Sequence, residues 1–266
     1  MQQAQVSGLA IYPVKSLGGI ALKTLPIDLL GPEWDRRFML VDAKRRFITQ
    51  RQFPRLCLIS VALQAGQFSI TAAGHMTLTL EVSVAASATW DVTVWHDVVA
   101  ACDMGEKAAT WFSNYLGCEV RLVYLPESSV RAVDPVYAQA NDRVGFADGF
   151  PILLTTQASL DEINRELPGP ISMQRFRPNI VIDGTLPYAE DSWRRVRIGA
   201  LEFEVVKPCS RCAIPSINPQ TGQKQPIVAQ TLSRLRSRDN AVYFGQNLIH
   251  RGHGRIALGD RLTVLE

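Results

Sequence analysis

The amino-acid sequence predicts a mainly β fold with a few helices (α+β). Short segments in which apolar and polar residues alternate recur along the chain, and turn residues separate most of them. Few stretches have the longer apolar period of a helix. The chain has 266 residues, of which 47% are hydrophobic and 20% are charged, so it can form two domains with buried cores. Many short strands of this kind favour a β-barrel-like architecture.

Strands are predicted in the first half wherever this alternation holds. It is clearest where Leu78, Leu80 and Val82 alternate with polar residues, because these three can share one buried face. The first strand ends at a turn in which Gly18 and Gly19 would let the backbone approach an anion. The predicted strands span residues 6–14, 34–41, 47–49, 56–63, 67–71, 77–82, 90–95 and 121–125.

Residues 103–117 form the clearest predicted helix. Asp103 and Glu106 have the spacing of a capping pair, and Gly117 suits the left-handed position that ends many helices. One face of this helix is apolar and partly aromatic. We expect this stripe to pack into the core and not to bind a cofactor. Its residues are Ala108, Trp111, Phe112, Tyr115 and Leu116.

Residues 126–148 divide the chain. They are rich in Ser, Asp, Asn and Ala and show no periodicity, which predicts a loop that could cover a site. We therefore predict an N-terminal β-rich domain over residues 1–122 and a second domain over residues 123–266.

The second domain is predicted to combine strands with two helices. One helix begins at a capping box, Ser159 to Glu162, and ends at Leu167, and the other spans residues 226–237. His250 and His253 are interpreted as surface loop residues without a role. Strands are predicted at residues 150–156, 176–182, 195–198 and 201–205, and in two pieces within 255–266.

Two cysteines three residues apart form the most informative motif, Lys207-Pro208-Cys209-Ser210-Arg211-Cys212. Pro208 cannot donate a hydrogen bond to a sheet, so we expect the preceding strand to end there. Lys207 and Arg211 favour the thiolate form of a neighbouring cysteine. The residues leave four interpretations open: a dithiol redox pair, half of a structural zinc site, two buried structural cysteines, or one thiolate that binds a soft transition metal.

The stretch KPCSRCAIPSINPQTG, from Lys207 to Gly222, resembles the metal-binding loop of the MOSC-domain proteins. This molybdenum-cofactor family includes the mitochondrial amidoxime-reducing component and bacterial proteins that reduce N-hydroxylated bases. The resemblance covers essentially the whole chain. Further segments match family patterns, in the family order, at Ile11–Ser16, Arg37–Phe38, Phe146–Pro151, Phe176–Asn179, Glu190–Trp193 and Phe244–Asn247.

The resemblance implies a C-terminal MOSC β-barrel, an N-terminal β-rich domain and a molybdenum cofactor (Mo-molybdopterin) between them. It also implies that Cys212 is the molybdenum ligand and the catalytic residue. Arginine side chains suit the phosphate of such a cofactor because their donors form a planar fork. The cofactor-binding residues that the resemblance implies are Lys15, Ser16, Arg37, Arg177, Asn179, Cys209, Ser210 and Arg211.

The activity that the resemblance implies is the reduction of N-hydroxylated compounds, such as hydroxylamino bases and amidoximes, to amines. Some bacterial relatives carry a ferredoxin-like extension, whereas this sequence ends at Glu266 without one. We therefore expect a separate flavin or iron–sulfur reductase, or a cytochrome, to supply the electrons. Pyridoxal phosphate binding is also attributed to the family. Two alternatives are a carrier of the molybdenum cofactor or of sulfur, and a purely structural or interaction protein.

Composition limits the other partners. A net charge of +3 is too small to indicate binding of a nucleic acid duplex. Five cysteines make a disulfide framework improbable and indicate a reducing compartment. The N-terminal residues show no signal peptide, and no apolar run is long enough to cross a membrane. We expect a cytoplasmic protein without a membrane anchor.

Overall fold

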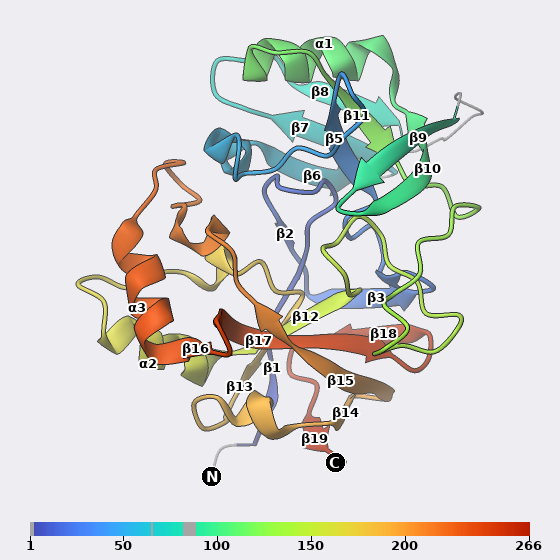
Figure 1. The fold of residues 1–266 in the computed structure, drawn as a ribbon. Helices are drawn as coiled ribbons and strands as arrows, with labels where there is room; N and C mark the ends of the chain where they lie inside the picture. Colours follow the sequence, from blue (N-terminus) through green and yellow to red (C-terminus); the bar gives the residue numbers. More distant parts are fainter. Residues whose placement is uncertain (1–2, 65, 82–88) are drawn as a thin grey trace.

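The computed structural model describes residues 3–64, 66–81 and 89–266. The chain forms two β-rich lobes, which lie one above the other in Figure 1. The upper lobe carries helix α1 (Gly105–Leu116), and the lower lobe carries helices α2 (Gln157–Arg165) and α3 (Pro226–Arg236) together with both termini. The prediction of a mainly β fold with a few helices is confirmed.

One large sheet organises the lower lobe. Its strands follow the order β19-β14-β15-β17-β12-β13-β1-β2, and β16 pairs with β17. Strands β12 and β13 pair in parallel, and helix α2 lies in the connection between them, as a parallel crossover requires. The strands are β1 (Gln5–Ile11), β2 (Ile20–Ala21), β12 (Ile152–Thr156), β13 (Ile180–Asp183), β14 (Arg195–Ile198), β15 (Leu201–Ser210), β16 (Ser237–Arg238), β17 (Ala241–His250) and β19 (Leu262–Val264).

Smaller sheets form the upper lobe and the region between the lobes. The upper lobe contains the sheets β5-β11-β10-β9 and β6-β7-β8, and their core includes the buried rings of Phe38, Phe68 and Phe112. A third sheet has the order β18-β3-β4. These strands are β3 (Thr24–Asp28), β4 (Gly31–Pro32), β5 (Phe38–Asp42), β6 (Ser60–Gln64), β7 (Gln67–Thr71), β8 (Leu78–Glu81), β9 (Thr89–Val94), β10 (Asp97–Asp103), β11 (Val120–Tyr124) and β18 (Gly254–Ala257).

Sheet pairing crosses the predicted domain boundary. Strand β1 pairs with β13, and β3 pairs with β18, so these two N-terminal strands pair with strands of the second predicted domain. Between them, Val14 and Leu17 pack into the core of the upper lobe. The first strand in the sheets of the upper lobe is therefore β5. Residues 126–148 form no regular strand or helix, and they run from the upper lobe to the lower one.

Local backbone geometry moves several predicted strand ends. The strand expected at 34–41 starts at Phe38, because Trp34 and Arg36 have positive φ angles of 65° and 47° that turn the chain. Residues 56–63 divide into a 3₁₀ turn, η1 (Pro54–Leu58), and strand β6. Residues 47–49 touch β5, where the Ile48 amide donates to the Leu40 carbonyl at 3.0 Å, but they form no regular strand. Val82, the predicted end of another strand, lies outside the described residues.

Helix ends differ from the predicted caps. Gly117 ends α1 with a φ of 68°, as predicted. The expected capping box of α2 is wrong, because Thr156 is the N-cap and its side chain accepts a hydrogen bond from the Ser159 amide. The Ser159 hydroxyl instead donates to the buried carboxylate of Glu190 at 2.8 Å. Burial raises the pKa of Glu190, and the hydroxyl groups of Ser159 and Thr156, which both donate to its carboxylate, oppose the rise.

The strand before the cysteine motif also runs further than expected. Pro208 lies within β15, which continues to Ser210 and pairs with β17. The register shifts twice along this pair, between Val205 and Lys207 and between Pro208 and Ser210. A β-bulge tolerates a proline because it interrupts the hydrogen-bond ladder. The motif therefore begins on a sheet strand and leaves it at Arg211.

Three further 3₁₀ turns lie near the site or support it. They are η2 (Met173–Arg175), η3 (Ala189–Ser192) and η4 (Ile214–Ser216). Asp191 of η3 accepts hydrogen bonds from Gln246 on β17 and Arg236 on α3, at 2.7 and 2.5 Å. These contacts join the Glu190–Trp193 and Phe244–Asn247 segments, so both act in holding the lower lobe together.

Candidate functional site

A cavity of about 960 Å³ lies where segments of both lobes meet. One part of its lining comes from the upper lobe and from the N-terminal segment that leads to it. This part contains Lys15, Arg36, Arg51 and residues of the β9–β10 turn. From the lower lobe it is lined by the end of β15, the residues around Phe176, and Asn247 of β17. The 126–148 loop supplies residues 130–135 and 147–148. The expectation that this loop covers a site agrees with this position.

The cysteine motif lies at one side of the cavity. Cys209, Ser210, Arg211 and Cys212 all line it. Arg211 donates from Nη1 to the Cys209 sulfur at 3.0 Å and from Nη2 to the Phe176 carbonyl at 2.8 Å. Cys212 is exposed, Cys209 is partly buried, and all five cysteines are free thiols. Arg211 therefore restrains the first cysteine and leaves the second free to meet a ligand.

Arg177 and Asn179 face the same cavity, as their spacing around Pro178 suggested. The alternation of a strand does not place them there, because β13 begins only at Ile180. Arg177 instead has a left-handed φ of 58°, which is strained for a residue with a side chain. Asn179 is fixed by three contacts: its Oδ1 accepts from the Leu153 amide at 3.1 Å, its Nδ2 donates to the Ala10 carbonyl at 3.2 Å, and its own amide donates to the Leu153 carbonyl at 2.8 Å.

A second arginine packs against Arg177. The guanidinium groups of Arg36 and Arg177 lie 4.3 and 4.2 Å from the ring of Tyr12. Arg36 donates to the Arg177 carbonyl at 3.0 Å and to the buried Asp35 carboxylate at 2.6 Å. Burial lowers the pKa of Arg177 to about 10, and the neighbouring positive charge of Arg36 contributes.

Arg37, which the resemblance assigns to the cofactor, does not line the cavity. Its side chain is buried and donates to the Leu125 carbonyl and the Tyr124 hydroxyl, both at 3.1 Å. Arg36 lines the cavity in its place. The left-handed φ of Arg36 explains this exchange, because the turn reverses the direction that a regular strand would give to neighbouring side chains.

Lys15 and Ser16 line the cavity, but protein groups already occupy much of their hydrogen-bonding capacity. Lys15 Nζ donates to the Phe146 carbonyl at 2.7 Å and to Asp148 at 2.5 Å. Burial lowers the pKa of Lys15, although Asp148 opposes the shift. Desolvation opposes the ionisation of Asp148, but the charge of Lys15 outweighs it and holds the pKa of Asp148 well below its ordinary range.

The turn that contains Ser16 approaches protein atoms and not an open anion site. The Ser16 hydroxyl accepts from the Gln50 amide at 3.3 Å. A side chain at Gly18 would place Cβ 2.8 Å from the Ile59 carbonyl oxygen, and one at Gly19 would place it 2.5 Å from the Tyr12 ring. Close packing against these groups explains the two glycines, neither of which lines the cavity.

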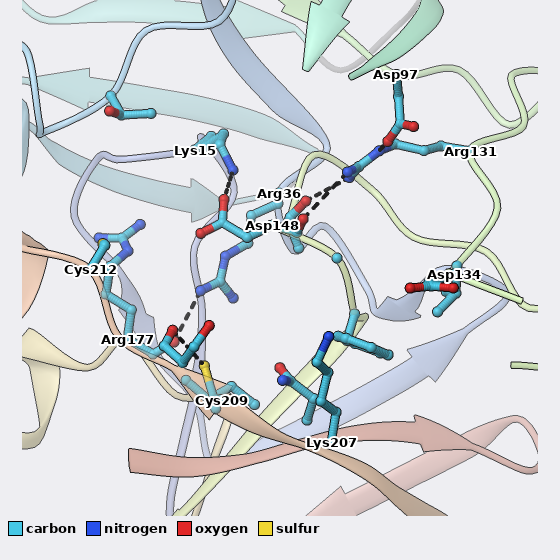
Figure 2. Close-up of a pocket in the computed structure, with 18 of the residues that line it drawn as sticks. Lys15, Arg36, Asp97, Arg131, Asp134, Asp148, Arg177, Lys207, Cys209 and Cys212 are labelled. Atoms are coloured by element: carbon cyan, nitrogen blue, oxygen red, sulfur yellow. Dashed lines mark hydrogen bonds and ion pairs between the residues drawn. The ribbon is translucent and has the colours of Figure 1, made fainter. Parts of the chain in front are cut away.

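Arg51 and Asp134, which belong to no motif described above, line the cavity, and so does Lys207 of the cysteine motif. Arg51 lies 4.6 Å from the Trp95 ring, and Lys207 lies 4.5 Å from the Tyr137 ring. Neither contact could be found from local sequence, because each partner is more than forty residues away. Figure 2 shows the charged side chains distributed around the cavity.

Two buried donors near the cysteine motif have no hydrogen-bond partner among the residues that the structure describes. Nη2 of Arg177 and Nε of Arg211 are shielded from solvent and make no hydrogen bond. A buried charged group left unpaired is costly, so these atoms suit an anionic ligand in the cavity. Within the described ranges, no group of three or more His, Cys, Asp and Glu side chains could hold a metal ion.

Two family profiles match most of the chain. Residues 3–119 match the MOSC N-terminal beta barrel domain, and residues 141–263 match the MOSC domain. The first match ends before the 126–148 loop, and the second begins within it. In the described part of the chain, no helix has the length and apolar character needed to cross a membrane.

Several named proteins are similar to this chain over most of its length. The chain is 33% identical to mitochondrial amidoxime-reducing component 1 of Mus musculus over 99% of its own length and 83% of that protein. It is 31% identical to the Homo sapiens protein of the same name, over 99% and 84%. It is also 34% identical to the molybdenum cofactor sulfurase of Drosophila mojavensis, over 86% of this chain but 30% of that longer protein.

Proposed function

Since this chain belongs to the family of proteins with a MOSC N-terminal domain and a MOSC domain, we propose that it is a molybdenum-cofactor-dependent reductase of N-hydroxylated compounds. The names of its amidoxime-reducing relatives support this proposal over nearly the whole chain. We propose that hydroxylamino bases and amidoximes are reduced to amines. The electrons would come from a separate flavin or iron–sulfur reductase or a cytochrome.

One observation of this structure carries the proposal. The exposed Cys212 thiol lines the cavity next to Arg211, and Arg177 lines the same cavity. Among the described residues, Nε of Arg211 and Nη2 of Arg177 are buried and have no hydrogen-bond partner. Soft thiolate ligands suit transition metals, and arginine suits phosphate. The residues present therefore fit a metal complex with an anionic phosphate group, and the unsatisfied donors would gain partners when it binds.

We assign the following roles. Cys212 would hold the metal, and Arg177 and Arg211 would hold the phosphate or other anionic oxygens of the cofactor. When bound, the cofactor supplies two-electron oxygen-atom transfer between the N-hydroxyl group and water. Asn179 and Arg36 would keep Arg177 in its strained conformation. The remaining proposed contacts are Lys15, Ser16, Cys209 and Ser210, with Arg37 supporting its neighbour Arg36 from outside the cavity.

The fixed geometry around the motif would orient these groups before the substrate arrives. Strand β15 holds Cys209 and Ser210 in the large sheet, and Arg211 Nη2 ties the motif to the Phe176 carbonyl at 2.8 Å. Donors that are positioned in advance cost little reorganisation during reaction. The open side of the cavity at Cys212 would admit the substrate and release the amine and water.

A carrier of the molybdenum cofactor or of sulfur is a second candidate function. The exposure of the Cys212 thiol and the similarity to molybdenum cofactor sulfurases favour it. A carrier would bind the cofactor or a transferable persulfide but would not turn over an N-hydroxylated substrate. Turnover with an electron donor therefore separates the two functions.

The test is elemental analysis and pterin fluorescence of protein produced in a host that makes the molybdenum cofactor. We would compare wild type with Cys212→Ala and Cys209→Ala, and assay benzamidoxime reduction with reduced methyl viologen. The proposal expects about one molybdenum per wild-type chain, together with activity that Cys212→Ala reduces at least about a hundredfold. Cys209→Ala should retain the metal more fully, since Cys209 would only support it.

Other outcomes would redirect the assignment. Molybdenum and pterin without turnover, or a persulfide that passes to an acceptor, would favour the carrier. Full activity in Cys212→Ala would show that the metal ligand lies elsewhere. Little molybdenum in any sample would remove the support for both cofactor-based functions.

A further inference from the structure

The cavity has two chemically different sides. The side around the cysteine motif contains Arg36, Arg177 and Arg211, whereas the other side is formed by the β9–β10 turn and residues 130–135. In Figure 2, Asp134 lies across the cavity view from Arg177 and Cys212. A cavity of about 960 Å³ is at the upper end of the range for small-molecule sites. It therefore has room for a substrate beside the proposed cofactor.

The second side combines apolar surface with one free carboxylate. Val98 and Val130 line the cavity and are 67% and 58% exposed, so they offer apolar contact area to a ligand. The cavity lining in the described residues contains three carboxylates. Asp97 is paired with Arg131 at 2.7 Å and Asp148 with Lys15 at 2.5 Å. Asp134 makes no salt bridge among the described residues.

Local backbone holds the Asp134 carboxylate in place. The Val136 amide donates to its Oδ1 at 3.0 Å, and Arg131 anchors the same loop by donating to the Gly145 and Ala147 carbonyls at 2.8 and 2.6 Å. One carboxylate oxygen is thus bound to the loop and the other, Oδ2, has no protein partner in the described structure. The cationic side chains of Arg51 and Lys207 also line the cavity, and each lies over an aromatic ring, Trp95 and Tyr137 respectively.

We propose that Asp134 is a specificity-determining residue that binds a positively charged group of the substrate. This proposal rests on the proposed reductase function and adds a substrate class: N-hydroxylated compounds with an apolar body and a cationic group away from the reacting nitrogen. The apolar body contacts Val98 and Val130, and the cation pairs with the Asp134 carboxylate. The reacting N-hydroxyl group then lies toward Cys212, on the opposite side of the cavity.

The experiment compares two amidoximes of similar size and different charge. 4-(Aminomethyl)benzamidoxime is cationic at neutral pH, and 4-ethylbenzamidoxime is neutral. We expect wild type to have the higher kcat/KM for the cationic compound. An exposed ion pair contributes little, so Asp134→Asn should lower the cationic-to-neutral ratio about threefold to fivefold, mainly through KM. Asn keeps the acceptor for the Val136 amide, so the loop should stay folded.

Controls separate charge at this position from general effects. Asp91→Asn removes a charge from an exposed position on β9 that does not line the cavity, and it should leave the ratio unchanged. Asp134→Lys should lower the ratio further than Asp134→Asn. High ionic strength should lower the wild-type ratio and have little effect on the Asp134→Asn ratio, because salt screens an exposed pair.

An unchanged ratio in both Asp134 variants would overturn the proposal, even if both amidoximes are reduced. Failure of wild type to reduce either compound would instead count against the proposed function. In that case, calorimetric binding of 4-(aminomethyl)benzamidoxime still tests Asp134: the proposal expects about threefold to fivefold weaker binding by Asp134→Asn. Equal affinities would contradict it.

Discussion

At the scale of single residues, neighbouring arginines have different environments. Arg36 lines the cavity beside Arg177, while Arg37 is buried against Tyr124 and Leu125. Sequence alone could not choose between two adjacent arginines, because the choice depends on a left-handed φ of 47° at Arg36. Backbone strain of this kind often lies at functional sites. Arg177 and Ser16, which also line the cavity, have left-handed φ angles of 58° and 74°.

The first prediction at this scale concerns Arg177. Arg177→Met should lower cofactor retention about tenfold to a hundredfold, because a charge-assisted hydrogen bond contributes about 1.5–3 kcal/mol. Cofactor retention by Arg177→Lys should lie between that of wild type and that of Arg177→Met, because lysine keeps the charge and loses the planar fork of donors. The measurement is molybdenum and pterin content per chain after dialysis. Stability without cofactor should change little, because the variant removes a buried cation together with its bond to the Leu17 carbonyl.

The matched control for this prediction is Arg121→Met. Arg121 bridges Asp103 and Glu106 in the upper lobe and does not line the cavity. This variant should retain the cofactor as wild type does. Equal retention by Arg177→Met and wild type would contradict the assignment of Arg177 to the anionic group.

At the scale of elements, the β15–β17 pair presents the cysteine motif. The register shift between Pro208 and Ser210 places two residues of β17, Phe244 and Gly245, opposite Cys209. Gly245 has a φ of 78°, and a Cβ there would lie 2.7 Å from the Leu154 carbonyl oxygen. A left-handed glycine at the start of a bulge bends the strand. The bulge therefore bends β17 opposite Cys209, where the end of β15 reaches the cavity.

Gly245→Ala tests this element. It should destabilise the protein by about 3–5 kcal/mol, because it adds backbone strain to a contact with a β12 carbonyl that cannot move aside. Urea unfolding measures the change. Gly74→Ala is the matched control: Gly74 has a φ of 75° with no atom within 4 Å of the added Cβ, so the cost there should be about 1 kcal/mol. Similar costs at both positions would show that close packing at Gly245 is unimportant.

At the scale of the whole molecule, the cavity depends on contacts between segments far apart in sequence. Lys15 follows β1, and its Nζ donates to both Phe146 and Asp148 in the connection between the lobes. Trp95, on the β9–β10 turn of the upper lobe, donates from Nε1 to Asp148 at 3.3 Å. Asp148 therefore joins the N-terminal segment, the upper lobe and the entry to β12. We expect this network to fix the shape of the cavity.

Asp148→Asn should destabilise the protein by about 1–2 kcal/mol near pH 7, because it leaves Lys15 buried without a counter-charge. The value is modest because the Asp148 side chain is 61% exposed. The folded-state pKa of Asp148 is lowered, so its contribution is present above the ordinary pKa of 3.8 and is lost as pH falls through the folded-state value. Urea unfolding at a series of pH values should show the difference from wild type shrinking in acid.

The control for this network is Glu202→Gln, which removes an exposed ion pair with Arg197 and should leave the free energy of unfolding nearly unchanged. A double-mutant cycle with Lys15→Met should give a clear coupling energy between Lys15 and Asp148. If Asp148→Asn behaves like Glu202→Gln, and the difference from wild type does not depend on pH, the network does not hold the lobes.

The sequence by itself determined the mainly β class, the α1 helix with its Gly117 end, the β14–β15 hairpin and the family resemblance. These features depend on local alternation, helical periodicity and turn residues, which the chain carries wherever it folds. It also identified the Cys209–Cys212 motif and Arg177 as candidates. The assignment of those residues to a cofactor remains a prediction.

Tertiary structure decided which residues meet. In the folded chain, β15 continues through Pro208, and the N-terminal strand β1 pairs with β13 of the lower lobe. Thr156 is the N-cap of α2. In the folded chain Arg36 also lines the cavity, and Asp134 lies there without an ion-pair partner among the described residues. Each of these results depends on bulges, left-handed residues or pairings between distant segments. Such features have no local periodic signal, because the free energy that stabilises them comes from contacts made only in the folded chain.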